Sequence, residues 1–235
     1  MPRLRSDAVL HLYCIRRAGE PAPEDALAGL DGAAVRLVEV GAALGAWVSA
    51  LEARAVPTPE RLRAHDDVVR AALRSATPLP VRFGTVLDDD ADVWALLEAR
   101  RADFDAALAR VAGCVEMGVT VYLGDAPAAQ LPVEETAAAP ASGREYLERR
   151  RAALHAEQAR RAEAEALLER VASSFDAALP VMRTPLPAPG VAGTLAHLVP
   201  RDRLAEYRDA VERASRALPD VRLARSGPWA PYSFV

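Results

Sequence analysis

Hydrophobic and polar positions follow two different periods along this chain, and together they predict both strands and helices. Apolar, aromatic and β-branched runs with a two-residue period indicate strands. These strand-like runs are residues 8–15, 33–40, 79–87, 114–123, 178–184, 191–199 and 220–225. Apolar residues at steps of three and four, or alanine-rich stretches, predict helices over 42–54, 59–75, 88–113, 143–175 and 201–217. This mixture of elements predicts an α+β fold.

Two of the predicted helices have distinctive sequences. Thr58 followed by Pro59 is a typical helix start, and His65 then falls within the apolar stripe of the helix at 59–75. The helix at 143–175 is nearly all Ala, Arg and Glu in its middle, and Arg161 interrupts a sevenfold spacing of apolar residues. We expect this long charged helix to be solvated over much of its length and to project from its domain.

Composition also predicts the domain boundaries. Residues 124–142 are rich in Ala and Pro and lack periodicity, which indicates a linker. We therefore expect an N-terminal α+β domain at 1–123 and a C-terminal domain at 143–235, which carries an aromatic tail at 227–235. If the strand at 114–123 opens the second half, its elements follow the βαββαβ order of a ferredoxin-like domain.

Charge and motifs exclude several classes of function. The net charge is −4 and all 29 basic residues are Arg, which gives no reason to expect a nucleic-acid partner. No apolar run reaches the roughly 18 residues of a membrane span, and Cys14 and Cys114 are predicted to be free thiols of a cytoplasmic protein. The glycines at 41 and 45 have the wrong spacing for a phosphate loop, and no His or Cys has metal-ligand spacing. We expect no cofactor and no metal.

His65 and Arg82 are the most notable polar residues within predicted elements. Burying either side chain without a partner is costly, so a structural polar cluster that fixes the helix at 59–75 to the strand at 79–87 is the preferred interpretation. A catalytic group that includes Asp66 or Asp67 is conceivable, although no motif supports it. Asp88, Asp89 and Asp90 are interpreted as helix-capping carboxylates rather than as a cation site.

The tail is unusual because chain ends tend to be polar and frayed. Pro228 and Pro231 stiffen it, and Trp229, Tyr232 and Phe234 make it aromatic. It predicts either packing against its own domain or contact with a partner, and the two are compatible. The arginines at 149–151, 160 and 161 could bind an anionic partner, but a solvated helix face is the default interpretation.

Three groups of segments together resemble the F/L-type gas vesicle accessory proteins (GvpF/GvpL). The first group is His-Asp-Asp-Val-Val at 65–69 with Leu-Pro-Val-Arg-Phe-Gly-Thr at 79–85. The second is Val-Glu-Met-Gly-Val at 115–119, Val-Tyr at 121–122 and Arg-Glu-Tyr-Leu at 144–147. The third is Gly-Pro-Trp-Ala-Pro-Tyr-Ser-Phe at 227–234. Met117, Thr120 and Ala230 depart from residues common in the family, and the resemblance does not separate the F-type from the L-type branch.

The resemblance implies two α+β domains, the second ferredoxin-like, and a cytoplasmic, non-enzymatic protein that associates with the gas vesicle. It implies binding to the hydrophobic gas vesicle shell protein (GvpA type) and to other accessory proteins during vesicle formation. The candidate protein-binding residues are Arg82, Phe83, Trp229, Pro231, Tyr232 and Phe234. The alternative function is a small-molecule-sensing regulatory protein, because paired ferredoxin-like domains often bind metabolites.

Overall fold

The computed structural model describes residues 8–21, 27–123, 143–188 and 190–235. Contacts within the chain divide it into two units, Met1–Glu116 together with Trp229–Val235, and Met117–Pro228. The expected linker at 124–142 lies outside the described residues. The aromatic end of the tail therefore groups with the first unit, whereas the sequence predicts that it belongs to the second domain.

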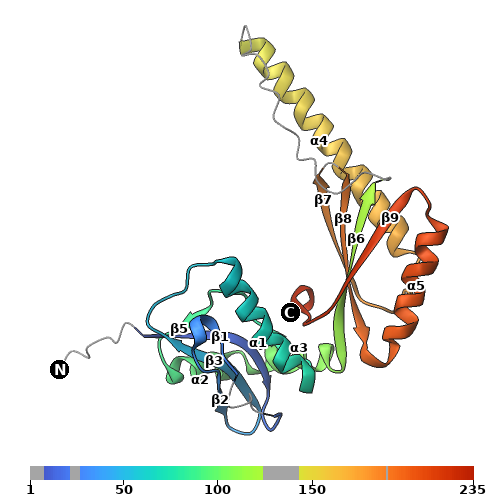
Figure 1. Ribbon diagram of the computed structural model, residues 1–235. Helices are drawn as coiled ribbons and strands as arrows, with labels where there is room; N and C mark the ends of the chain where they lie inside the picture. The colour runs from blue at the N-terminus through green and yellow to red at the C-terminus, as the bar shows by residue number, and fades with distance from the viewer. Residues whose placement is uncertain (1–7, 22–26, 124–142, 189) are drawn as a thin grey trace. The chain divides into compact units, whose positions relative to one another are not determined.

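The first unit is built on an antiparallel sheet in the order β2-β3-β1-β4, with β5 also pairing with β1 (Figure 1). Its elements are β1 (Val9–Arg17), η1 (Leu30–Gly32), β2 (Arg36–Val40), β3 (Leu44–Leu51), α1 (Pro59–Ser75), β4 (Leu79–Pro80), β5 (Val86–Leu87), α2 (Asp90–Ala99), α3 (Arg101–Val111) and, at the end of the chain, η3 (Tyr232–Phe234). Helix α1 begins as expected, because the Thr58 hydroxyl accepts a hydrogen bond from the Arg61 amide at 3.3 Å.

The prediction of a helix at 42–54 is wrong, because Leu44–Leu51 forms strand β3. This strand pairs with β1 on one side and with β2 on the other, and seven of its eight residues are buried. The alanines of the segment favour a helix locally. Trp47 and Val48, both almost fully buried, gain more from packing in the centre of a sheet.

Two other predicted elements are each divided in the structure. The strand expected at 79–87 consists of the short strands β4 and β5 with a turn between them. The helix expected at 88–113 is two helices, α2 and α3, which meet at Arg100, a residue with φ −115° and ψ 21°. Gly113 follows the second helix with φ 69°, a left-handed conformation that glycine adopts without strain.

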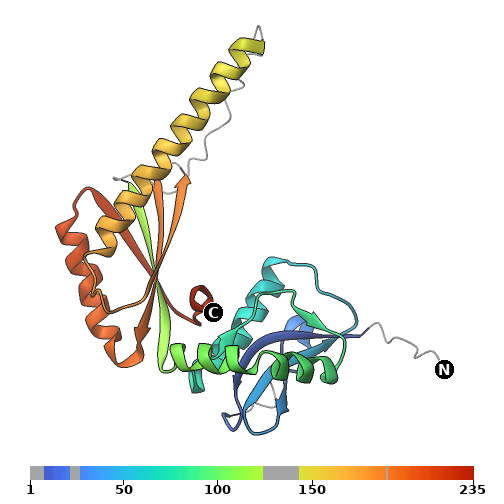
Figure 2. The same cartoon turned by 180° about the vertical axis from the view of Figure 1, so that it is seen from behind.

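The second unit has a four-stranded sheet in the order β7-β8-β6-β9. Its elements are β6 (Cys114–Leu123), α4 (Gly143–Ala172), β7 (Val181–Ala188), β8 (Val191–Pro200), η2 (Arg201–Arg203), α5 (Leu204–Ala217) and β9 (Val221–Trp229). The order β-α-β-β-α-β is the one that the sequence predicts when residues 114–123 open the second half. Helices α4 and α5 cover the same face of the sheet (Figures 1 and 2).

The core of the second unit lies between this sheet and its two helices. The most deeply buried side chains come from β6, α4, β8 and α5, and include Val119, Val121, Leu168, Val171, Leu195 and Tyr207. Among the helices in the described part of the chain, none is long and apolar enough to cross a membrane.

Candidate functional site

Residues 82–85 form a tight turn that strand β1 holds at both ends. The Val81 amide donates to the Tyr13 carbonyl at 2.9 Å, and the Leu12 amide donates to the Thr85 carbonyl at 3.0 Å. Within the turn, the amide and hydroxyl of Thr85 both donate to the Arg82 carbonyl, at 3.2 and 2.9 Å. Gly84 has φ 85°, which a larger residue would adopt only with strain. The turn is therefore a fixed feature of the first unit.

His65 lies beneath this turn but does not bind the Arg82 side chain. His65 is 3% exposed, and its Nε2 lies 2.9 Å from the Val81 carbonyl oxygen. Arg82 is exposed. His65 therefore contacts the backbone carbonyl of Val81, the residue before Arg82, instead of the Arg82 side chain with which we expected it to form a cluster. Phe83 is half-buried, and its ring centroid lies 5.8 Å from that of His65.

The buried partner of His65 is His11, which is not among the site residues predicted from the sequence. His11 Nε2 and His65 Nδ1 are 2.9 Å apart. A carbonyl oxygen only accepts, so His65 carries its proton on Nε2 and accepts from His11 through Nδ1. His11 therefore carries its proton on Nε2, which leaves its buried Nδ1 as a lone pair without a hydrogen-bond partner. Burial, and then the charge of His65, lower the pKa of His11 to about 4.

Tyr13 extends this network on the same strand. Its hydroxyl donates to Ser49 Oγ at 3.1 Å and accepts from the Leu30 amide at 2.9 Å, while Ser49 donates to the Ala34 carbonyl at 2.9 Å. His11 and Tyr13 are two residues apart in a strand, so their shared face could have been predicted. The long-range partners Ser49 and Leu30 have no such local signal.

The tail packs within the first unit through one cation–π contact and three hydrogen bonds. Arg70 Cζ lies 4.2 Å from the centroid of the Trp229 ring. The Glu116 carboxylate accepts from the amide and the hydroxyl of Ser233, at 2.8 and 2.9 Å. Arg110 donates to the Phe234 carbonyl at 2.7 Å. The tail is thus a part of the first unit rather than a loose end.

Only some of the candidate side chains in the tail remain accessible. Ala230 and Pro231 are buried, Trp229 and Phe234 are half-buried, and Tyr232 is 37% exposed. Burial, and then the negative charge of Asp66, raise the pKa of Tyr232. The Tyr232 phenol thus lies near Asp66 of helix α1, the residue next to His65. Helix α1 therefore borders both the tail, through Arg70, and the turn, through His65.

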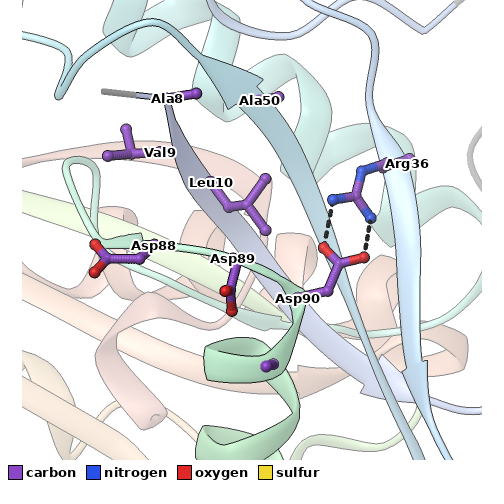
Figure 3. A pocket seen from close by; sticks show the side chains of 9 residues that line it. Ala8, Val9, Leu10, Arg36, Ala50, Asp88, Asp89 and Asp90 are labelled. Atoms are coloured by element: carbon purple, nitrogen blue, oxygen red, sulfur yellow. Dashed lines mark hydrogen bonds and ion pairs between the residues drawn. The ribbon is translucent and has the colours of Figure 1, made fainter. Parts of the chain in front are cut away.

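Of the acidic run at 88–90, which we expected to cap the following helix, Asp89 does so. Asp89 Oδ1 accepts from the Asp92 amide at 3.1 Å and caps α2, and Asp90 forms an ion pair with Arg36 (Figure 3). The two residues line a cavity of about 370 Å³ near the start of β1. The described residues contain no group of three or more side chains that could hold a metal ion.

Comparisons with known proteins agree on one family. The family model described as "Gas vesicle synthesis protein GvpL/GvpF" matches residues 9–235. Gas vesicle protein L of Streptomyces sp. (strain CB03234) is 36% identical, over 99% of this chain and 94% of the relative.

Solved structures with the same fold come from two other organisms. The crystal structure of GvpF from Anabaena sp. PCC7120 has a TM-score of 0.70 and 20% identity, and covers 97% of this chain and 95% of that one. The crystal structure of GvpF from Microcystis aeruginosa has a TM-score of 0.68 and 18% identity, and covers 96% of this chain and 98% of that one. The match over nearly the whole sequence, together with the shared fold, shows that this chain belongs to the GvpL/GvpF family of gas vesicle proteins.

Proposed function

We propose that this chain is a non-enzymatic assembly protein that binds the hydrophobic gas vesicle shell protein (GvpA type) and other accessory proteins while the vesicle forms. Membership of the GvpL/GvpF family supports a role in gas vesicle formation. An apolar shell subunit needs a partner before assembly, because exposed apolar surface aggregates.

The observation that carries the proposal is the pair of accessible side chains bordering α1. The Arg82 guanidinium stands on a turn whose backbone is fixed by hydrogen bonds. Tyr232 is 37% exposed and lies on a tail that Glu116 and Arg110 hold in place. Arg and Tyr are enriched at protein interfaces, and a backbone that is already fixed loses little further entropy on binding. Phe83, Trp229, Pro231 and Phe234 then act as supports of this surface.

The geometry of His65 favours binding over catalysis. Both of its ring nitrogens are already hydrogen-bonded, to His11 and to the Val81 carbonyl, and the side chain is almost completely buried. A general acid or base must reach the proton that it transfers. Arg82 faces solvent instead of joining His65, so the two residues do not form a shared reaction site.

Co-expression of the chain with the shell protein, followed by co-purification, tests the proposal. We expect Arg82→Ala and Tyr232→Ala together to reduce co-elution. Arg101→Ala and Trp94→Ala together are the matched control, because both side chains are exposed in the same unit. Equal co-elution of the two double variants would move the interface elsewhere. A folded chain that never co-elutes with the shell protein would contradict the proposal and favour the small-molecule regulatory alternative.

A further inference from the structure

Strand β1 and helix α1 hold the backbone on both sides of the turn at 82–85. The Val81 amide donates to β1 at 2.9 Å, and the Val81 carbonyl oxygen lies 2.9 Å from His65 Nε2. On the other side, the Thr85 carbonyl accepts from β1 at 3.0 Å, while the amide and the hydroxyl of Thr85 donate to the Arg82 carbonyl. The backbone of the turn therefore cannot rearrange without the loss of several hydrogen bonds.

The tip of the turn, residues 82–84, carries hydrogen-bonding groups that remain available. The amides of Phe83 and Gly84 donate to no acceptor among the residues that the structure describes. Within the same part of the chain, the carbonyls of these two residues accept from no donor. The peptide groups of the tip alone suit either a neutral or a charged ligand, so the charge of the nearby side chains decides between them.

That charge is positive and uncompensated. Arg82 is the only charged residue between positions 79 and 87. Its guanidinium is exposed and forms no ion pair or hydrogen bond with any described residue. By contrast, Arg17 and Arg36, which are also exposed in the first unit, bind carboxylates of that unit. The guanidinium of Arg82 thus stands beside fixed backbone donors with no anion of its own.

The acidic residues that follow His65 on α1 do not neutralise this charge. Asp66 is bound to Arg70 at 2.6 Å. Asp67 is exposed, and two residues along a helix turn its side chain about 200° away from the side of His65, which faces the turn. Neither carboxylate forms an ion pair with Arg82 in the described part of the chain.

We propose that the tip of this turn binds a carboxylate of the partner protein, which accepts hydrogen bonds from the Arg82 guanidinium and from the amides of Phe83 and Gly84. A planar guanidinium matches a carboxylate in shape, and hydrogen bonds between charged groups are roughly twice as strong as neutral ones. Donors that are already fixed lower the entropic cost of binding. The inference rests on the proposed function, because it gives Arg82 of that surface a specific ligand.

Other occupants fit the tip less well. A neutral acceptor leaves the guanidinium without a counter-charge. A nucleic acid or a phosphate-rich surface is bound by several basic side chains, whereas residues 79–87 contain Arg82 alone. Phe83 is half-buried, with its ring centroid 5.8 Å from that of His65, so a purely apolar partner meets little apolar surface at the tip.

Nuclear magnetic resonance titration of the full chain, labelled with ¹⁵N, tests this inference. The probe is N-acetyl-L-glutamate N-methylamide, a blocked residue with one carboxylate. The comparison ligand is N-acetyl-L-glutamine N-methylamide, which has the same shape without the charge. At constant ionic strength we expect the glutamate probe to shift the amide signals of Phe83 and Gly84 and to saturate with a Kd on the order of 10 mM. The glutamine ligand should bind at least about fivefold more weakly.

Single substitutions locate the site. Arg82→Gln should weaken binding of the glutamate probe at least about fivefold and should abolish the shifts of the tip amides. Arg82→Lys keeps the charge but not the planar fork and should weaken binding less. Arg74→Gln is the matched control, because Arg74 is also exposed and has no ion pair with a described residue, and it should change the affinity by less than about 1.5-fold.

Three results would overturn the inference. They are the absence of a saturable shift at Phe83 and Gly84, equal binding of the two ligands, and equal weakening by Arg82→Gln and Arg74→Gln. None of these measurements uses the shell protein. If the tip binds the glutamate probe but the chain never co-elutes with the shell protein, the proposed function fails and the carboxylate site stands. Co-elution without binding of the probe removes this inference and leaves the proposed function.

Discussion

Trp229 lies against the Arg70 guanidinium, with Arg70 Cζ 4.2 Å from the centroid of the indole ring. Arg70 is also bound to Asp66 Oδ2 at 2.6 Å, which fixes the guanidinium on the surface of α1. The last residues of the chain thus contribute to the packing of the unit that contains the first strand. A change in the tail therefore acts on the stability of the first unit as well as on any partner.

Replacing Trp229 tests this structural role. Trp229→Ala removes the cation–π contact and the packing of a half-buried ring, and we expect it to lower the free energy of unfolding by about 1–3 kcal/mol. Urea unfolding followed by circular dichroism measures the change. Trp94→Ala is the control, because Trp94 is 49% exposed on α2, and it should change the stability by less than about 0.5 kcal/mol. Equal stability of both variants would show that the tail is not structural.

Gly29 offers a test of the buried Tyr13 network. A Cβ at position 29 would lie 2.8 Å from Ser49 Oγ and would overlap the Tyr13 hydroxyl. Gly29 has φ −97°, so it does not adopt the left-handed conformation that favours glycine. Gly29→Ala should destabilise the first unit by about 2 kcal/mol or more, because it displaces buried hydrogen-bonding groups.

A double-mutant cycle distinguishes this steric effect from a general loss of stability. Tyr13→Phe removes the hydroxyl that meets the new methyl group, so Gly29→Ala should cost less in that background. Both costs are obtained from urea titrations followed by tryptophan fluorescence. Trp47, Trp94 and Trp229, the three tryptophans of the chain, all belong to the first unit, so the signal reports that unit. If Gly29→Ala cost as much stability with Tyr13→Phe as without it, the overlap of the new methyl group with the Tyr13 hydroxyl would be contradicted.

Local signals made some elements predictable from sequence. Thr58 and Pro59 fix the start of α1, and the strand at 114–123 agrees in both bounds with β6 because its alternation is uninterrupted. The segment 42–54 could not be assigned in this way, because its strand conformation depends on pairing with β1 and β2. Long-range pairing overrides local helix propensity.

The candidate site could likewise be predicted only in part from the sequence. His65 was recognisable because a histidine within an apolar stripe needs a polar partner. The identity of that partner was not recognisable, since His11 lies 54 residues away in the chain. The location of the aromatic tail could not be predicted from the sequence either, because nothing near position 229 indicates that Arg70 and Glu116 will contact it.

Gly193 of the second unit should be difficult to replace. Its φ is 157°, and an added Cβ would overlap the Thr184 carbonyl oxygen and lie 2.9 Å from Leu168 Cδ1. Because the first obstacle is backbone of the neighbouring strand, it cannot rotate away. Gly193→Ala should lower the stability by about 3 kcal/mol, measured by far-ultraviolet circular dichroism during thermal unfolding. Gly41→Ala, which meets no atom within 4 Å at φ 57°, should cost only about 1 kcal/mol.

Two buried histidines predict a dependence of stability on pH. Burial, and then the charge of His65, lower the pKa of His11 to about 4. Burial, and then the charge of Arg183, lower the pKa of His197 to about 4. In the unfolded chain both have a pKa near 6.5. Between these values the unfolded state binds more protons than the folded state. The stabilising contribution is therefore fully present above about pH 6.5 and is lost as the pH falls towards 4, by at most about 3 kcal/mol for each histidine.

His11→Gln separates this effect from the general titration of carboxylates in acid. The glutamine amide can still donate a hydrogen bond towards His65 but cannot take up a proton, so the first unit of the variant should lose less stability between about pH 7 and pH 4.5 than the wild-type unit. Tryptophan fluorescence during urea titration measures the first unit alone, and the difference in slope between the two proteins isolates His11. His155→Gln, at an exposed position of α4, is the matched control and should follow the wild type. If His11→Gln retained the wild-type loss of stability, protonation of His11 would not be the cause, and the buried lone pair on Nδ1 would have no part in the acid sensitivity of this unit.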